Sequence, residues 1–437
     1  MKYRIGVFTY NFEWRVLALH IVFYAVLMWV FTTYTVDIYL YMNLWENSFN
    51  IEKAIFSPFL IVAAFALLRK NDLPSYFLLN IILVLVVTPS LVLFSGCNLP
   101  LYFVLTTWFA FAVVAVITQT IKVRTIAVKP ISMLLLLRCI AVCSIIFVVS
   151  IIAFDGLKFI NFDFSRVYDF RQDAADNLPF MYAYLMPNFS YVIIPIGIVL
   201  SLLFKKRVLL LVLIFCAVMI FALTSHKSPL FIPFFIICAY WFYRHPQKVS
   251  ITIMVLITGV VISGLLYYLI PRGLDDIWIW IGAIIVFRIF ALPAILNWHH
   301  LEFFSTHPYY YWADSKFSFG LVTSPYDLPM PFQVSAFKVG VEGMGSANTG
   351  WIGSGMGQAG YLGILFYSVL FGLLLSVIDA YGKKLDRSFI FAVFLVTVTS
   401  AAETSDLSIM PLTHGMITLF VILVLLNADE IKKRILM

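Results

Sequence analysis

Apolar runs long enough to cross a bilayer recur from one end of this chain to the other. A helix needs about 20 mostly apolar residues to span the hydrocarbon core, so 437 residues leave room for about twelve such helices with short loops. Charged residues make up only 12% of the sequence, against about 25% in ordinary soluble proteins. The sequence therefore predicts an all-α integral membrane protein, with residues 1–437 forming a single polytopic domain.

The expected spans can be placed from the apolar runs alone. The first run follows no cleavable-signal pattern, so we expect it to remain in the mature chain. The spans are expected near residues 14–34, 53–68, 76–94, 101–119, 131–153, 189–204, 208–224, 229–243, 249–270, 351–379, 389–402 and 413–427.

Basic residues alternate from one set of loops to the other. One set of loops and ends holds 19 of the 29 basic residues and few acids, which by the positive-inside rule makes that side cytoplasmic. This orientation puts both termini inside and two long loops outside, at 154–188 and 270–350, where we expect short amphipathic helices. The net charge of +7 is explained by topology and calls for no nucleic-acid partner.

The second long loop holds the polar residues that are most suggestive of a site. In a helix over 286–304, Arg288, His299 and Glu302 share one face at 3.6 residues per turn, although Pro293 would kink it. We interpret this segment as an interfacial helix that presents a cation to an anionic leaving group. The alternative is a helix whose charged residues snorkel to water or pair with each other.

The same helix carries the candidates for proton transfer. Glu302, His299 and His300 are the side chains in it that could accept a proton from a reacting hydroxyl. We also expect no metal site, because the Cys, His and acidic residues show no metal-ligand spacing. No phosphate-cradling Gly-Lys-Ser/Thr loop is present, which disfavours direct use of nucleotides.

Other candidates lie outside this helix. Arg166, Tyr168 and Arg171 fall in the first long loop, where surface ion pairs are the plainer explanation. Lys227 opens a span at the expected depth of lipid phosphates, where it could also be a snorkelling anchor. The aromatic run over 309–312 is either a sugar-stacking platform or part of an interfacial aromatic belt.

Taken together, the order and placement of these patterns resemble the O-antigen polymerases, the Wzy-type enzymes that polymerise oligosaccharide repeat units. The resemblance covers most of the chain as a topology. It is sharpened by Phe162-Asp163-Phe164 followed by Tyr168 and Arg171, by Lys227 with Pro229, by Arg288 with Phe290 and Pro293, and by Asn348 before Gly357-Gln358-Ala359-Gly360-Tyr361-Leu362-Gly363. After Arg171, Tyr182 stands where the family has a glycine, so the role of the first loop does not transfer directly.

The resemblance implies a GT-C-like polytopic architecture and a metal-independent glycosyl transfer without cofactors. The growing glycan would pass from undecaprenyl pyrophosphate to a sugar hydroxyl of the next lipid-linked repeat unit, at the periplasmic face of the bacterial inner membrane. The implied partners are these lipid-linked oligosaccharides, membrane lipids and a chain-length regulator. Candidate residues for binding the substrate or its pyrophosphate are Arg171, Lys227, Arg166, Tyr168, Arg272 and Asn348.

Two alternatives stay open. A ligase of similar architecture would hand the glycan to lipid A core instead. A flippase or other transporter would instead place charged residues within the spans to line an aqueous path, whereas this sequence keeps most of its charges in the loops.

Overall fold

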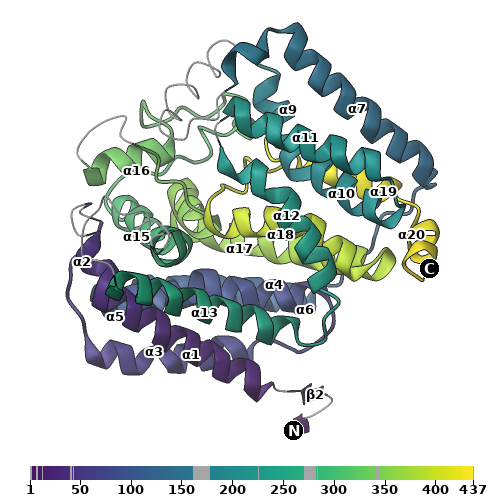
Figure 1. Ribbon diagram of the computed structural model, residues 1–437. Helices are drawn as coiled ribbons and strands as arrows, with labels where there is room; N and C mark the ends of the chain where they lie inside the picture. Colours follow the sequence, from purple (N-terminus) through teal and green to yellow (C-terminus); the bar gives the residue numbers. More distant parts are fainter. Residues whose placement is uncertain are drawn as a thin grey trace. The chain divides into compact units, whose positions relative to one another are not determined.

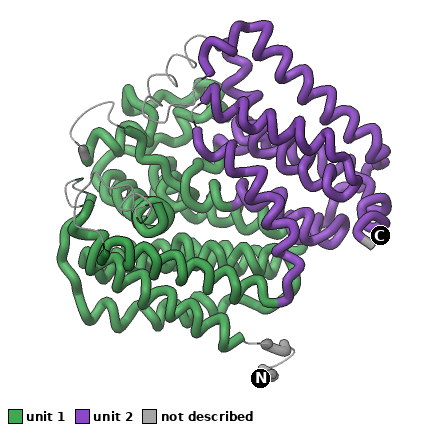
Figure 2. The backbone as a smooth tube through the Cα atoms, in the orientation of Figure 1, with its two compact units in different colours: residues 1–122, 247–376, 399–408 green, residues 123–246, 377–398, 409–437 purple. Residues whose placement is uncertain are grey.

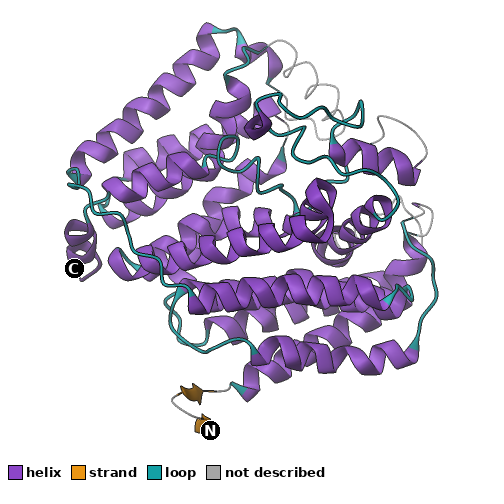
Figure 3. Ribbon diagram, turned by 180° about the vertical axis from the view of Figure 1, so that it is seen from behind, coloured by secondary structure: helices purple, strands orange, loops and turns teal. Residues whose placement is uncertain are grey.

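The computed structural model is almost entirely helical (Figure 3). It describes residues 2–5, 8–11, 13–39, 42, 44–160, 178–224, 226–269, 282, 284–339 and 345–436. The described strands are β1 (Lys2–Ile5) and β2 (Phe8–Asn11), which pair antiparallel as a short hairpin ahead of the first helix.

Within the described chain, nine helices are long and apolar enough to cross a membrane, as expected for a multi-pass membrane protein. They cover Trp14–Ile38, Pro74–Gly96, Leu101–Thr120, Met133–Ala153, Tyr182–Leu203, Arg207–Thr224, Lys248–Leu269, Ile284–Phe304 and Trp351–Lys384. Four of the expected spans correspond to shorter helices: α3 (Ile51–Ala66), α12 (Lys227–Phe242), α18 (Arg387–Glu403) and α19 (Met416–Leu425). The helix over Ile284–Phe304 lies inside the stretch that the sequence assigned to a loop.

The sequence predicted one polytopic domain, and the backbone divides into two compact units (Figure 2). Unit 1 comprises residues 1–122, 247–376 and 399–408, and unit 2 comprises residues 123–246, 377–398 and 409–437. Helices α17 (Trp351–Lys384) and α18 each contribute residues to both units.

Unit 1 is a bundle of helices that pack along one another. Its members are α1 (Trp14–Val30), η1 (Phe31–Thr35), α2 (Val36–Ile38), α3, α4 (Pro74–Ile82), η3 (Leu83–Val87), α5 (Thr88–Gly96), α6 (Leu101–Thr120) and α13 (Lys248–Leu269). Helix α13 lies along α1, and α5 lies against α1, α3 and α6 (Figure 1). The apolar character of these helices on all sides fits burial within a bundle or in lipid.

The remaining elements of unit 1 lie between α13 and α17 in the sequence. They are η6 (Ile284–Ala291), α15 (Leu292–Phe304), η7 (Lys316–Ser318) and α16 (Met330–Val339). Figure 1 shows α15 close to end-on, whereas α13 runs across the picture. Helix α15 therefore crosses the bundle direction instead of following it.

Unit 2 is built around α10 (Ile194–Leu203), which packs against α11 (Arg207–Thr224) and α12. Its other elements are α7 (Met133–Ala153), η4 (Gly156–Phe159), α9 (Tyr182–Asn188), η5 (Phe189–Ile193), α19 and α20 (Ala428–Leu436). The end of the chain is joined to this unit by hydrogen bonds from Thr418 Oγ1 to Asn188 Oδ1 (2.8 Å) and from Ile131 N–H to Leu425 O (3.0 Å).

Prolines explain three π-helical segments. The segments η3, η5 and η6 each precede a proline at the first or second position of the next helix, namely Pro89, Pro195 and Pro293. A proline inside a continuing helix has no N–H to donate, and its ring clashes with the carbonyl four residues earlier, so a widened preceding turn is a local solution. In η6 this changes the phase of the helix that carries Arg288.

Candidate functional site

Helix α15 packs near one end of the unit 1 bundle, whereas the preceding η6 reaches deeper, because the Phe290 ring lies 5.2 Å from that of Phe23 within α1. The Phe287 ring stacks on Tyr39, which follows α2, at 4.3 Å between centroids. The Trp298 ring lies 5.7 Å from that of Phe103, near the start of α6. The last two contacts lie at the end of the bundle opposite Arg15, at the start of α1, and Lys248, at the start of α13. The helix over Ile284–Phe304 is long and apolar enough to cross a membrane, so the interfacial arrangement that the sequence suggested stays a prediction.

The predicted stripe of functional residues is not a single exposed face. Arg288 is exposed, Ile295 and His299 are buried, and Glu302 is partly exposed. The widened turn of η6 replaces the regular 3.6-residue period over 284–291, so the spacing rule used on the sequence does not hold there.

Arg288 lies in η6, near the start of this helix. Its guanidinium carbon lies 5.8 Å from the centroid of the Phe287 ring. Because each helical residue advances about 1.5 Å, the 14 positions between Arg288 and Glu302 put their Cα atoms roughly 20 Å apart. The two side chains therefore do not pair with each other, in contrast to one of the interpretations of the sequence.

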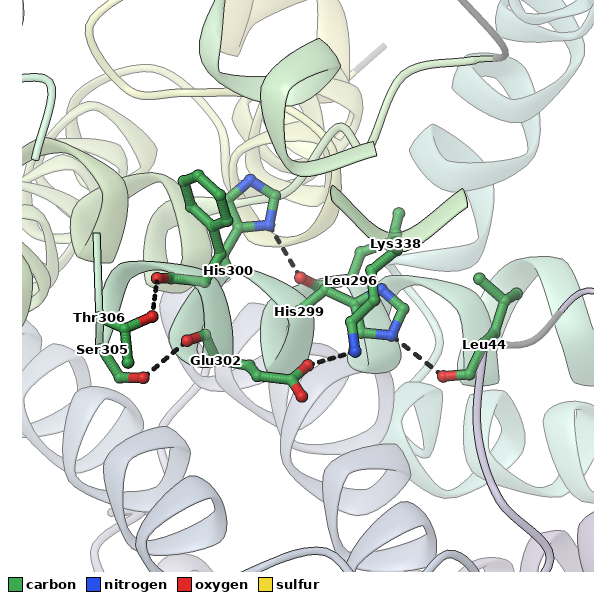
Figure 4. Close-up of polar contacts among 9 residues, drawn as sticks. Leu44, Leu296, His299, His300, Glu302, Ser305, Thr306 and Lys338 are labelled. Atoms are coloured by element: carbon green, nitrogen blue, oxygen red, sulfur yellow. Dashed lines mark hydrogen bonds and ion pairs between the residues drawn. The ribbon is translucent and has the colours of Figure 1, made fainter. Parts of the chain in front are cut away.

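Glu302 instead forms an ion pair with Lys338 of α16 (Figure 4). Both side chains are partly exposed, at 36% for Glu302 and 23% for Lys338. Helix α16 is held on α15 by aromatic packing, because the Phe337 ring lies 5.1 Å from that of Phe303 and 5.6 Å from that of His307. A carboxylate and an ammonium from different helices thus meet between two partly exposed side chains, with the contacting oxygen, Glu302 Oε2, itself buried.

The two histidines of α15 are buried and bonded to backbone carbonyls. His299 Nε2 lies 3.0 Å from Leu44 O, and His300 Nδ1 lies 2.8 Å from Leu296 O one turn earlier (Figure 4). A ring nitrogen facing a carbonyl must carry the proton, so neither of these nitrogens can accept one. Among the three base candidates, Glu302 is the one with exposed surface.

Asn297 joins α15 to the start of α17. Its buried Oδ1 accepts hydrogen bonds from the hydroxyl of Thr349 and from Gly353 N–H. It therefore satisfies an amide that the first turn of a helix leaves without an internal partner. Asn348, which the sequence singled out, is exposed beside this turn and accepts a hydrogen bond from Ser346 Oγ (2.9 Å).

Several predicted site residues cannot be related to α15. Arg166, Tyr168, Arg171 and Arg272 lie outside the described residues. Lys227 is the exposed first residue of α12 and belongs to unit 2, whereas Arg288 and Glu302 belong to unit 1. The structure thus brings together Glu302 with His299 and His300 on one helix, and adds Lys338.

A second polar cluster lies where α17 is broken. The backbone leaves helical geometry at Ala359 and at Gly360, whose φ is +62°. The carbonyls of Gly357 and Gln358 accept hydrogen bonds from Tyr310 N–H and Tyr311 N–H, each at 2.9 Å. The break therefore exposes backbone carbonyls of α17 that accept hydrogen bonds from the aromatic run over 309–312. A broken membrane helix has to satisfy such backbone groups.

Side chains complete this cluster. The buried Gln358 donates from Nε2 to Asp314 Oδ1 (3.2 Å) and to Asp406 Oδ2 (3.1 Å). Asp406 Oδ1 also accepts from Tyr367 OH (2.7 Å), whose oxygen in turn accepts from Trp312 Nε1 (2.9 Å). Buried Tyr310 offers no open ring for stacking, while Tyr311 is exposed.

The pKa of Asp314, a carboxylic acid of this cluster, is shifted. Partial burial of its carboxylate raises the pKa of Asp314 despite the exposed surface of the residue as a whole. The hydrogen bond from Gln358 opposes this increase in pKa, and the charge of Asp406 adds to it.

No protein-family model, curated protein or solved structure matches this chain. Within the part of the chain that the structure describes, no three His, Cys, Asp or Glu side chains are grouped so as to hold a metal ion.

Lys338, Asp314, Gln358 and Asp406 were not among the predicted site residues. Lys338 has only a weak signal in the sequence, as one of nine basic residues on the side expected to be external. Gln358 lies in a glycine-rich run that packs closely in the structure, because a Cβ on Gly363 would lie 2.0 Å from Gly355 O.

Proposed function

We propose that this protein polymerises lipid-linked oligosaccharide repeat units of O-antigen or a related surface polysaccharide. The observation that carries the proposal is the ion pair between Glu302 of α15 and Lys338 of α16, an acid and a cation that meet near one end of a bundle of apolar helices. That end lies opposite the basic ends of α1 and α13, and the positive-inside rule supports the proposal that it faces the periplasm of a bacterium.

The chemistry required is a single displacement at an anomeric carbon. The hydroxyl oxygen of the incoming repeat unit forms a bond to this carbon as the bond from the carbon to the pyrophosphate oxygen breaks. The electron pair leaves with undecaprenyl pyrophosphate, and the hydroxyl proton passes to a base. Cations that stabilise the leaving charge supply electrostatic catalysis, and the positioned base adds to it.

The described residues offer a base and a phosphate-binding cation for this reaction. Glu302 is the base, because its carboxylate is partly exposed while His299 and His300 are buried. Arg288, exposed near the other end of the helix, binds phosphate oxygens of an elongated lipid-linked substrate. Arg166, Tyr168, Arg171, Lys227, Arg272 and Asn348 remain proposed substrate contacts on the strength of the family resemblance, which also suggests the GT-C-like architecture, reaction without a cofactor and a chain-length regulator as partner.

An acceptor competition separates the polymerase from its two alternatives. Purified protein in nanodiscs receives undecaprenyl-pyrophosphate-linked repeat units alone or with lipid A core, and products are resolved by gel. The polymerase makes a ladder of longer lipid-linked glycans from repeat units alone. Transfer that requires lipid A core would identify a ligase, and lipid-linked glycan that changes leaflet without a new bond would identify a flippase.

A further inference from the structure

Lys338 and Glu302 lie close enough to neutralise each other when no substrate is bound. The contact joins two separate helices, α15 and α16. A cation in such a pair attracts an incoming anion less strongly than it would alone, and the carboxylate is held by the ammonium instead of facing a hydroxyl. The resting pair therefore holds both groups in a less reactive state.

We propose that Lys338 is a phosphate-binding residue, and that an anionic donor releases Glu302 by replacing it on the Lys338 ammonium. This inference rests on the proposed function and names the part of the donor that the site takes, a phosphate or pyrophosphate group. The base then becomes available only when a donor is in place.

The partial exposure of both side chains gives an incoming anion access to the pair. The Glu302 side chain is 36% exposed and that of Lys338 23%, with the contacting Glu302 Oε2 itself buried. A pyrophosphate carries more negative charge than one carboxylate and offers several acceptor oxygens to the three N–H donors of a lysine. It can therefore compete with Glu302 for the ammonium, whereas a pair with both side chains deeply buried would resist separation.

The position of Lys338 does not depend on the ion pair. Phe337 packs on Phe303 and His307, and the buried side chains of Met330 and Val334 fix the rest of α16. Lys338 can thus change partner while α16 stays on α15. Its position also brings a cation much nearer to Glu302 than Arg288 lies along the helix, which places phosphate and base at the same reacting bond.

The exchange accounts for both the leaving charge and the hydroxyl proton in the reaction. The ammonium of Lys338 stabilises the charge that develops on the pyrophosphate oxygen as its bond to the anomeric carbon breaks. Glu302, no longer paired, accepts the proton of the attacking hydroxyl. When the pyrophosphate leaves and the proton passes to water, the Glu302–Lys338 pair forms again.

Binding of inorganic pyrophosphate tests the inference without requiring turnover. We expect Lys338→Gln to weaken binding by titration calorimetry roughly ten- to a hundredfold, the equivalent of one charge-assisted hydrogen bond. Glu302→Gln should do the opposite and tighten binding about two- to fivefold, because it removes the competing carboxylate. Lys316→Gln, which removes an exposed lysine from the same 305–339 stretch, is the matched control and should leave affinity unchanged.

A charge-swapped variant excludes a merely structural pair. If the pair only holds α16 in place, Glu302→Lys combined with Lys338→Glu restores both the melting temperature and turnover. Our account expects the swap to restore the melting temperature but not turnover. Recovery of turnover, or a pyrophosphate affinity that Lys338→Gln leaves unchanged, would overturn the inference.

The inference and the proposed function fail in different ways. Lys338-dependent pyrophosphate binding by a protein that makes no glycan ladder from its native substrate would support the phosphate site and reject the polymerase. A ladder made normally, by a protein whose Lys338→Gln variant binds pyrophosphate like the wild type, would keep the polymerase and reject the exchange.

Discussion

Asn297 of α15 and Gly353 of α17 are joined by a hydrogen bond of 3.1 Å between a side-chain oxygen and a backbone amide. The contact is buried, and Asn297 also accepts from Thr349. An amide side chain from one helix thus caps the first turn of another, which sets the position of α15 relative to α17 within unit 1.

Replacing this cap should destabilise the protein. Asn297→Ala leaves the Gly353 amide and the Thr349 hydroxyl without their acceptor, at a cost of about 1–3 kcal/mol. The melting temperature in detergent measures the loss. Asn348→Ala is the control, since this exposed neighbour should cost less than about 0.5 kcal/mol, and equal shifts in the two variants would contradict the cap.

The break in α17 should depend on glycine at position 360. Gly360 has φ +62°, where a side chain costs about 1–2 kcal/mol, and a Cβ there would also lie 2.8 Å from the Tyr309 ring. Gly320→Ala meets a similar positive φ with nothing within 4 Å, so it reports backbone strain alone. We expect Gly360→Ala to lower the melting temperature clearly more than Gly320→Ala, and a smaller effect would mean that Tyr309 moves aside.

The raised pKa of Asp314 predicts the direction of a pH effect. Because the folded state favours the protonated carboxyl, the folded protein holds this proton to a higher pH than the unfolded chain does. The associated stability is present below the ordinary pKa near 4 and falls as pH rises through the raised folded pKa. Melting temperatures measured across this interval should decline in the wild type more than in Asp314→Asn, and parallel curves would contradict the shift.

Glu302 and His300 should differ sharply in their effect on turnover. Glu302→Gln keeps the size of the side chain and removes the base, so turnover should fall by roughly 10²–10⁴. His300→Gln alters a buried ring whose proton-bearing nitrogen faces Leu296 O, so turnover normalised to folded protein should fall less than tenfold. The reverse order would move the base to His300.

The sequence predicted the elements better than the contacts between them. Long apolar runs were sufficient to locate α1, α6 and α13, because a span is set by its own length and hydrophobicity. The direction of α15 was harder to predict, since Ile284–Phe304 is apolar enough for a span but packs across other helices through Phe287 and Trp298. Such packing depends on residues far away in the sequence.

In the candidate site too, the individual residues were easier to predict than their contacts. Glu302, His299 and His300 could be singled out as ionisable groups beside an apolar helix, but no periodicity in one helix could reveal their partners. Lys338 lies 36 positions after Glu302, and Gln358 reaches Asp406 from 48 positions away. The helical stripe that included Arg288 failed for a local reason, because Pro293 widens the turn that precedes it.

The most direct test of the central claim is turnover of native undecaprenyl-pyrophosphate-linked repeat units by reconstituted protein, with wild type, Arg288→Ala and Glu302→Gln compared at equal folded concentration. We predict that the wild type produces a ladder of lengthening lipid-linked glycans and that both variants lose it. A wild-type protein that forms no glycosidic bond with its native substrate, or a full ladder from both variants, would contradict the account.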